Sequence, residues 1–312
     1  MNNFLIAFNA VAPLASYILI GIFIKRLNLV EDDFLGKLNR LLFKCFYPVI
    51  VFSNIYTSDF SQSADVKLIA YLTVFSVTLT ATLCFVVPKF IRSRATCGAF
   101  IQGTFRSNII LFGLPLTISI FGDGNAGMMS VATAFIIPLY NVLAVVVLEY
   151  FGGQTTNISA LLKNIAKNPL IIGAIIGILY NLFKLPAPAL MQSIVKNISN
   201  STTTFALIVL GASLRFSSLA RNLKYIAVCL FLRLIAVPAA AVLIAYFIGL
   251  EDMQLFTVLI IAATPVATSS YTMAHSMNSD HELAAQLVAI STVLSVFTIF
   301  SWIMLFFTLG LI

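Results

Sequence analysis

A near-continuous succession of long apolar stretches constrains this chain more than any other feature. Of its 312 residues, 60% are hydrophobic and only 9% are charged, whereas a soluble domain has about 25% charged residues. A water-soluble fold cannot bury so much apolar surface, and about 20 apolar residues allow a helix to cross a bilayer. We therefore expect an all-α integral membrane protein. The stretches predict ten transmembrane helices, at residues 3–24, 37–56, 67–88, 97–121, 126–150, 169–183, 202–217, 225–248, 253–277 and 284–309.

The distribution of Lys and Arg predicts the orientation of these helices. The formal net charge of +7 could suggest a nucleic-acid partner, but the basic residues sort by side of the membrane. If the N-terminus is outside, three of the 18 basic residues lie outside (Lys67, Lys184 and Lys196). Twelve then lie in cytoplasmic loops or helix ends: Lys25, Arg26, Lys37, Arg40, Lys89, Arg92, Arg94, Lys163, Lys167, Arg215, Arg221 and Lys224. This excess of cytoplasmic positive charge predicts that both termini are external and that no nucleic acid is bound.

A polar interval at residues 152–168 divides the predicted helices into two sets of five. Two related halves with an odd number of helices must insert in opposite orientations, which is the inverted-repeat design of many secondary transporters. We therefore predict a first five-helix repeat at residues 1–151, a cytoplasmic connecting loop at 152–168 and a second, inverted repeat at 169–312.

Prolines near the middle of the fourth and ninth predicted helices strengthen this symmetry. Pro115 and Pro265 occupy equivalent places in the two halves, and small or polar residues flank both. Interrupted helices at corresponding positions mark the substrate site of inverted-repeat carriers. We therefore expect a new half-helix to begin after each proline. The alternative is a pair of ordinary kinked helices that pack through small residues.

The half-helix ends at such breaks would suit an anion. The N-terminal end of a helix carries unsatisfied N–H groups and a partial positive charge. Asn108 could add an amide donor, whereas Ser269 and Ser270 could equally bond to their own backbone. The predicted substrate-binding residues are Asn108, Gly113, Leu114, Pro115, Thr264, Pro265, Val266, Ala267, Ser269 and Ser270.

Three cations fall within predicted helices. Arg106 lies near mid-span, where a charge is costly. It is a substrate counter-ion, or it reaches the cytoplasmic side or pairs with backbone carbonyls. Lys44 and Arg233 lie nearer helix starts, and we expect both to extend to the interface. No Asp or Glu lies at mid-span, which disfavours a buried carboxylate that binds a proton or sodium. Asn54, His275 and the backbone carbonyls at the helix breaks remain candidates for ion coupling.

Four segments of the chain resemble the auxin efflux carrier family, which includes plant auxin exporters and bacterial malonate and malate permeases. The segments are LNRLLFKCFYPVIVFSNI at 38–55, FRSNIILFGLPL at 105–116, RLIAVPAA at 233–240 and AATPVATSSYTMAHSMN at 262–278. The resemblance covers nearly the whole chain. It implies ten helices, a crossover of broken helices at mid-membrane, an external N-terminus and export or exchange of an organic anion across a bacterial inner membrane.

Other functions fit the sequence less well. A channel, or a membrane receptor or lipid sensor that uses the same crossover, stays open as an alternative. An enzyme is not expected, because it would need a nucleophile, a metal cluster or a paired acid and base within reach. His275 and His281, six residues apart near the end of the ninth predicted helix, are too few for a metal site. The four cysteines have no Cys-x-x-Cys spacing, so we expect no metal and no cofactor. Coupling to protons or sodium and assembly as a homodimer are left open.

Overall fold

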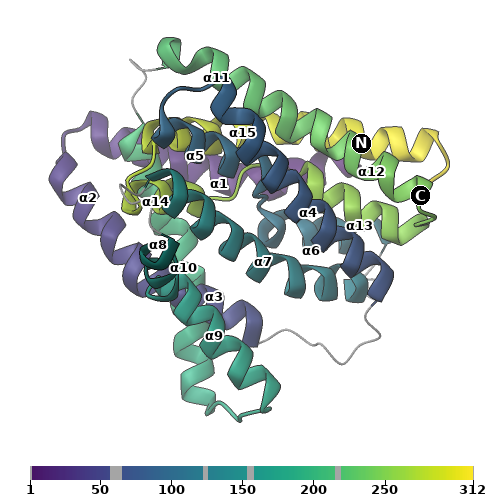
Figure 1. Ribbon diagram of the computed structural model, residues 1–312, viewed down its shortest axis with the longest axis horizontal. Helices are drawn as coiled ribbons and strands as arrows, with labels where there is room; N and C mark the ends of the chain where they lie inside the picture. Colours follow the sequence, from purple (N-terminus) through teal and green to yellow (C-terminus); the bar gives the residue numbers. More distant parts are fainter. Residues whose placement is uncertain (1, 57–64, 122–125, 153–157, 215–218, 312) are drawn as a thin grey trace.

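The computed structural model is helical throughout the part of the chain that it describes, which is residues 2–56, 65–121, 126–152, 158–214 and 219–311. Its long helices lie roughly along one direction, and α9 with its neighbours projects at one corner (Figure 1). The described residues form no strand beyond a single isolated bridge. The expected all-helical class is therefore confirmed.

The first half of the chain contains helices that are often bent or interrupted. They are α1 (Asn2–Arg26), α2 (Asp32–Leu41), η1 (Leu42–Phe46), α3 (Tyr47–Tyr56), α4 (Val66–Val86), η2 (Val87–Lys89), α5 (Arg94–Phe105), α6 (Ile109–Phe121) and α7 (Ala126–Gly152). Helix α8 (Ile158–Ala166) lies within the interval that was predicted as a connecting loop, of which residues 153–157 are outside the described part.

The second half of the chain continues the same pattern. It contains α9 (Pro169–Leu182), α10 (Ala189–Ser213), α11 (Leu219–Phe231), η5 (Leu232–Ala236), α12 (Val237–Phe247), α13 (Asp252–Ala263), α14 (Ser269–Ser276) and α15 (His281–Thr308). Helix α10 begins 13 residues before the predicted span at 202–217, so that boundary was wrong. The polar residues between 192 and 201 had suggested a loop, but they belong to this helix, in which most of them are exposed.

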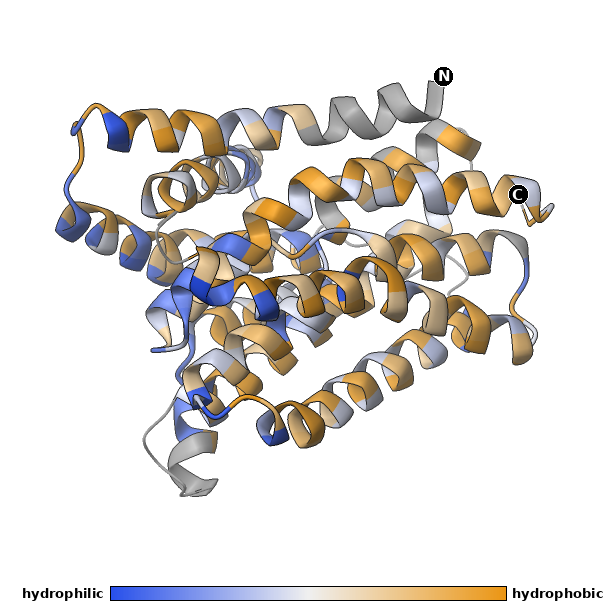
Figure 2. Ribbon diagram, turned by 90° about the horizontal axis from the view of Figure 1, so that it is seen from above, coloured by the Kyte–Doolittle hydropathy of each residue, from blue (hydrophilic) through white to orange (hydrophobic). Residues whose placement is uncertain are grey.

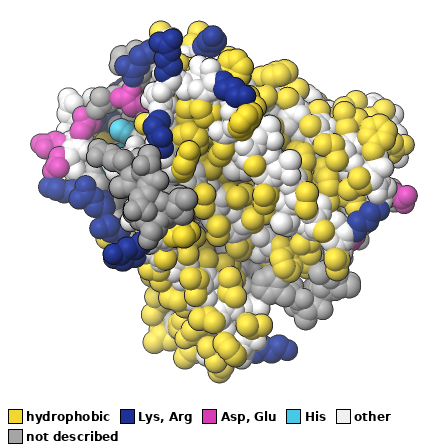
Figure 3. Space-filling model, in the orientation of Figure 1, with side chains coloured by type: hydrophobic (Ala, Val, Ile, Leu, Met, Phe, Trp, Pro, Cys, Tyr) yellow, Lys and Arg dark blue, Asp and Glu magenta, His cyan; other side chains and the backbone are white. Residues whose placement is uncertain are grey.

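Several helices are long and apolar enough to cross a membrane. Among the described residues, four helical segments meet both criteria: Val66–Lys89, Gly127–Gly152, Leu219–Phe247 and His281–Thr308. Hydrophobic residues make up much of the length of most helices in Figure 2. Hydrophobic side chains also cover most of the face in Figure 3, whereas Lys and Arg gather mainly toward the end near α2 and α11. An apolar exterior of this extent is typical of a protein surrounded by lipid.

Two π-turns explain how the chain passes a proline without losing its helical course. The η1 turn ends two residues before Pro48 of α3, and η5 ends two residues before Pro238 of α12. A proline cannot donate to the carbonyl four residues before it. In the residue before each proline, the N–H bonds to the carbonyl five residues back: Tyr47 to Leu42, and Val237 to Leu232. Such π-turns rotate the side chains that they carry and are frequent at functional sites.

Glycines allow two helix pairs to pack at very short range. Helix α1 lies along α10, and α3 lies along α9. A Cβ atom on Gly21 would lie 2.1 Å from the Ile208 carbonyl oxygen, and one on Gly211 would lie 2.1 Å from the Ile18 oxygen. Close contact through small residues is the usual way in which membrane helices associate, because lipid provides no hydrophobic drive between them.

Candidate functional site

Two helices are interrupted near the middle of the molecule, and the interruptions touch. Residues 106–108 separate α5 from α6, and residues 264–268 separate α13 from α14. The Asn108 N–H donates to the Pro265 carbonyl at 2.9 Å, and the Ala267 N–H donates to the Arg106 carbonyl at 3.2 Å. Ser107 and Val266 face each other as an antiparallel bridge between these bonds. Two short extended segments therefore cross and share their backbone hydrogen bonds.

The predicted interruption at Pro265 is present, but the one predicted after Pro115 is wrong. The backbone from Ile109 to Phe121 is one helix that includes Pro115, and the break comes at Arg106 to Asn108. The physical reason is pairing: the Pro265 carbonyl needs a donor from the other segment, and the Asn108 N–H supplies it. The side chains of Leu114 and Pro115 lie outside the described part of the structure.

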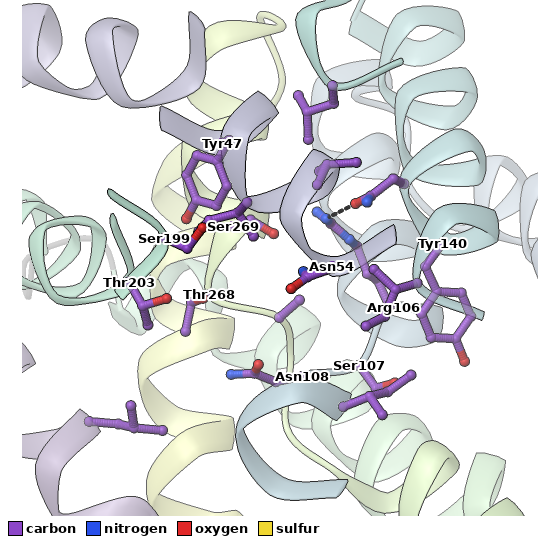
Figure 4. Close-up of a pocket in the computed structure, with 18 of the residues that line it drawn as sticks. Tyr47, Asn54, Arg106, Ser107, Asn108, Tyr140, Ser199, Thr203, Thr268 and Ser269 are labelled. Carbon is purple, nitrogen blue, oxygen red and sulfur yellow. Dashed lines mark hydrogen bonds between the residues drawn. The ribbon is translucent and has the colours of Figure 1, made fainter. Parts of the chain in front are cut away.

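A pocket of about 330 Å³ lies beside this crossing. The interruptions form one wall, and the other walls come from α1, α3, α7, α9 and α10. Figure 4 shows Ser199 and Thr203 of α10 on the same side as Thr268 and Ser269 of the second interruption. The polar lining residues are Tyr17, Tyr47, Asn54, Arg106, Ser107, Asn108, Tyr140, Asn141, Ser199, Asn200, Thr203, Thr204, Thr268 and Ser269. The apolar ones are Leu14, Ile50, Val51, Ile109, Ile137, Leu170 and Ala267.

Arg106 is the one charged residue among the described residues that line the pocket. Its side chain is 5% exposed. One Nη atom donates to Asn141 Oδ1 at 2.6 Å, which is the dashed bond in Figure 4. The other Nη atom lies 2.6 Å from the Met273 sulfur. Both partners are neutral, so the positive charge at the pocket has no carboxylate beside it in the described part of the chain.

The N-terminal ends of α6 and α14 begin directly after the crossing segments. Ile109 and Ser269, the first residues of these helices, both line the pocket. Asn108 is 7% exposed, and its Nδ2 atom has no hydrogen-bond partner among the described atoms. Two positive helix ends, a free amide donor and a guanidinium therefore surround the same space, which makes it favourable for an anion.

The structure brings together some of the residues that the sequence predicted. Asn54, Arg106, Asn108, Ala267 and Ser269 line the pocket. The others lie behind the lining of described residues or away from it: Gly113, Thr264, Pro265, Val266, Ser270 and His275. His275 lies near the far end of α14, where its ring centroid is 4.9 Å from that of His281.

Helix α10 contributes a polar face to the pocket that was not predicted from the sequence. Four pocket residues lie on one face of this helix: Ser199 and, one, four and five residues after it, Asn200, Thr203 and Thr204. The span predicted at 202–217 excluded half of this face. A search for polar residues at helical spacing, rather than for apolar length alone, would have found it.

Arg233 does not extend to the interface as predicted. Its side chain is 1% exposed, and all three of its nitrogens donate to backbone carbonyls beside the crossing. Arg233 belongs to the π-turn η5, and its side chain lies inside the protein. There it bonds to carbonyl groups at the ends of α5 and α13 rather than reaching the membrane–water interface. Lys44 is exposed.

The crossing of two interrupted helices beside a pocket defines a class of membrane transporters. The family described as membrane transport protein matches residues 6–157 and 153–303. This chain belongs to that family, and its resemblance to the auxin efflux carriers is confirmed.

One curated protein and one solved structure are also similar to this chain. An uncharacterized transporter of Methanothermobacter thermautotrophicus (strain Delta H) is 23% identical over 288 residues, which cover 91% of this chain and 93% of that protein. The sodium proton antiporter MjNhaP1 of Methanocaldococcus jannaschii aligns in structure with a TM-score of 0.59 and 14% identity, over 91% of this chain and 92% of the antiporter chain. The second similarity shows a shared fold and nothing of the substrate.

Proposed function

We propose that this chain is a secondary transporter that carries a small organic anion across the bacterial cytoplasmic membrane. The observation that carries this proposal is the Arg106 guanidinium, which lies at the pocket with neutral partners. A buried cation without a counter-ion is costly in a membrane protein. A carboxylate in the pocket would offset that cost.

The rest of the lining supports an organic substrate. Leu14, Val51 and Leu170 face the same space as the polar groups. A pocket of about 330 Å³ is at the small end of the range for small-molecule sites. An anion with an apolar body, such as an auxin-like acid or a short dicarboxylate, would use both kinds of contact.

We propose alternating access as the mechanism, within ten membrane helices arranged as two inverted five-helix repeats at residues 1–151 and 169–312, joined by the cytoplasmic interval 152–168. The tight pairs α1 with α10 and α3 with α9 support a fixed scaffold. The crossing segments and their helices would then rock against it with the bound anion. Both termini would be external, as the distribution of basic residues suggests.

The proposal is tested by uptake into proteoliposomes that contain the purified protein. Radiolabelled mono- and dicarboxylates would be offered one at a time, at several pH values and with or without sodium. The similarity in fold to an antiporter makes the sodium and pH arms worthwhile, since that protein exchanges sodium and protons. We expect saturable uptake of at least one carboxylate. No flux of any anion under any of these conditions would contradict the proposal.

Asn108 provides a graded test of anion recognition. We expect Asn108→Ala to raise the KM for the carboxylate about tenfold, because one hydrogen bond to a charged group is lost. Asn108→Asp should abolish uptake, because it places a negative charge where the substrate's charge must lie. Initial rates over a range of substrate concentrations measure both effects.

The control is Asn164→Ala in α8, an exposed residue bonded to Glu149, and it should leave KM unchanged. Equal KM values for Asn108→Ala and Asn164→Ala would remove Asn108 from the site.

A further inference from the structure

We infer that Arg233 is a positioning residue: its guanidinium acts as a built-in cation that holds together the C-terminal ends of the two half-helices α5 and α13. Nε and Nη2 donate to the Thr264 carbonyl at 3.0 and 2.7 Å. Nη2 also reaches the Ile261 carbonyl at 3.4 Å. Nη1 reaches the carbonyls of Thr104 and Phe105 at 3.3 and 3.2 Å. One side chain thus binds both helix ends at once.

The electrostatics of these ends explain why a full positive charge fits there. The last four carbonyls of a helix lack partners within it, and together they carry a partial charge of about −0.5. Two such ends meet beside the crossing, so about one negative charge gathers in a buried place. The hydrogen-bond acceptors of Arg233 in the described part of the chain are backbone carbonyls, not carboxylates. The guanidinium therefore compensates the helix ends themselves.

The surroundings of Arg233 fix its position. It lies in the π-turn η5, and the Trp302 indole N–H donates to the carbonyl of the next residue, Leu234, at 2.9 Å. At 1% exposure, Arg233 is among the largest fully buried side chains of the described residues. A planar fork of five donors can span two separate acceptor groups, which an ammonium group on a lysine cannot do equally well.

If the chain is a transporter, as proposed above, Arg233 also limits where a coupling cation can bind. In other transporters with broken helices, the backbone carbonyls at the breaks coordinate the coupling cation. Here Arg233 occupies that set of carbonyls, so the ends of α5 and α13 do not form a site for a coupling cation. Any dependence of transport on sodium would have to arise elsewhere in the molecule.

The bridge between Ser107 and Val266 offers a readout that does not depend on transport. The flanking hydrogen bonds make these residues a closely spaced antiparallel pair, with Cα atoms about 4.5 Å apart. That separation allows a disulfide. The variant Ser107→Cys with Val266→Cys, in which the native Cys45, Cys84, Cys97 and Cys229 are replaced by Ala, should therefore form a disulfide rapidly under mild oxidation.

The experiment compares the rate of this cross-link in membranes for Arg233, Arg233→Lys and Arg233→Met. We expect Arg233→Met to slow the cross-link by about tenfold, because the charged hydrogen bonds that hold the two ends are lost. Millimolar guanidinium should restore much of the rate in Arg233→Met and leave the Arg233 protein unchanged. Arg221→Met removes an exposed arginine that pairs with Glu282, and it should cross-link at the unaltered rate.

Each outcome of this experiment decides the inference. Equal rates for Arg233 and Arg233→Met, or slowing that guanidinium does not relieve, would overturn it. If Arg233→Met yields no folded protein, Arg233→Lys decides: a slower cross-link in this folded variant supports the inference, and an unchanged rate overturns it. A failure of wild-type protein to transport any anion would refute the proposed function but leave the cross-linking result intact.

Discussion

Replacement of Arg106 by Gln is expected to abolish saturable carboxylate uptake. The guanidinium is the one charge at the lining of the described pocket, and its partners Asn141 and Met273 are neutral. A charge pair at about 4 Å in a partly buried site is worth about 4 kcal/mol before the desolvation cost is subtracted. We therefore expect affinity to fall by about 100-fold or more, which initial-rate measurements in proteoliposomes would register as no detectable saturation.

The Arg106 prediction has a matched control in Arg221→Gln. Arg221 has the same chemistry, but its side chain is 73% exposed and pairs with Glu282 at 3.0 Å. An exposed ion pair contributes little, so uptake by this variant should be normal. Arg106→Lys keeps the charge and should retain part of the activity. If Arg106→Gln transported as well as Arg221→Gln, the positive charge would not be part of substrate recognition.

The second large effect concerns folding and falls on Gly211. Alanine usually stabilises a helix relative to glycine by about 0.5–1 kcal/mol. At Gly211 the added Cβ would lie 2.1 Å from the Ile18 backbone oxygen, which cannot move without separating α1 from α10. We expect Gly211→Ala to destabilise the protein by about 3 kcal/mol or more. The thermal midpoint and the monodisperse fraction in detergent measure the loss.

Gly36→Ala separates this steric effect from the ordinary effect of replacing glycine. A Cβ at Gly36 in α2 would meet only the His275 ring, at 3.9 Å. This variant should melt at the wild-type temperature or slightly above it. A Gly211→Ala protein as stable as Gly36→Ala would show that α1 and α10 do not pack in the way described.

The sequence predicted the helical class well, because the length of apolar stretches is set by the bilayer and needs no tertiary information. It predicted the boundaries less well where polar residues belong to a helix. Ser199 and Asn200 look like loop residues in the sequence, because the pocket that they line forms only in the folded molecule.

The position of the fourth-helix break could not be predicted from proline alone. Membrane helices tolerate proline when neighbouring groups satisfy the freed carbonyl, and α6 runs through Pro115. The break instead depends on partners that are distant in sequence, since Asn108 bonds to the Pro265 carbonyl. Arg233 was misjudged for the same reason, because its acceptors at Thr104 and Thr264 meet only in the folded molecule.

Counterflow in proteoliposomes tests the central claim, that this chain is an anion carrier, most directly. Vesicles loaded with an unlabelled carboxylate would be diluted into a trace of the labelled one, with sodium and pH equal on both sides. A carrier that alternates its access accumulates label transiently above its equilibrium level, and we predict this overshoot for wild-type protein and its absence for Arg106→Gln. Binding without overshoot would indicate a receptor, and monotonic equilibration would indicate a channel; either result would contradict the account.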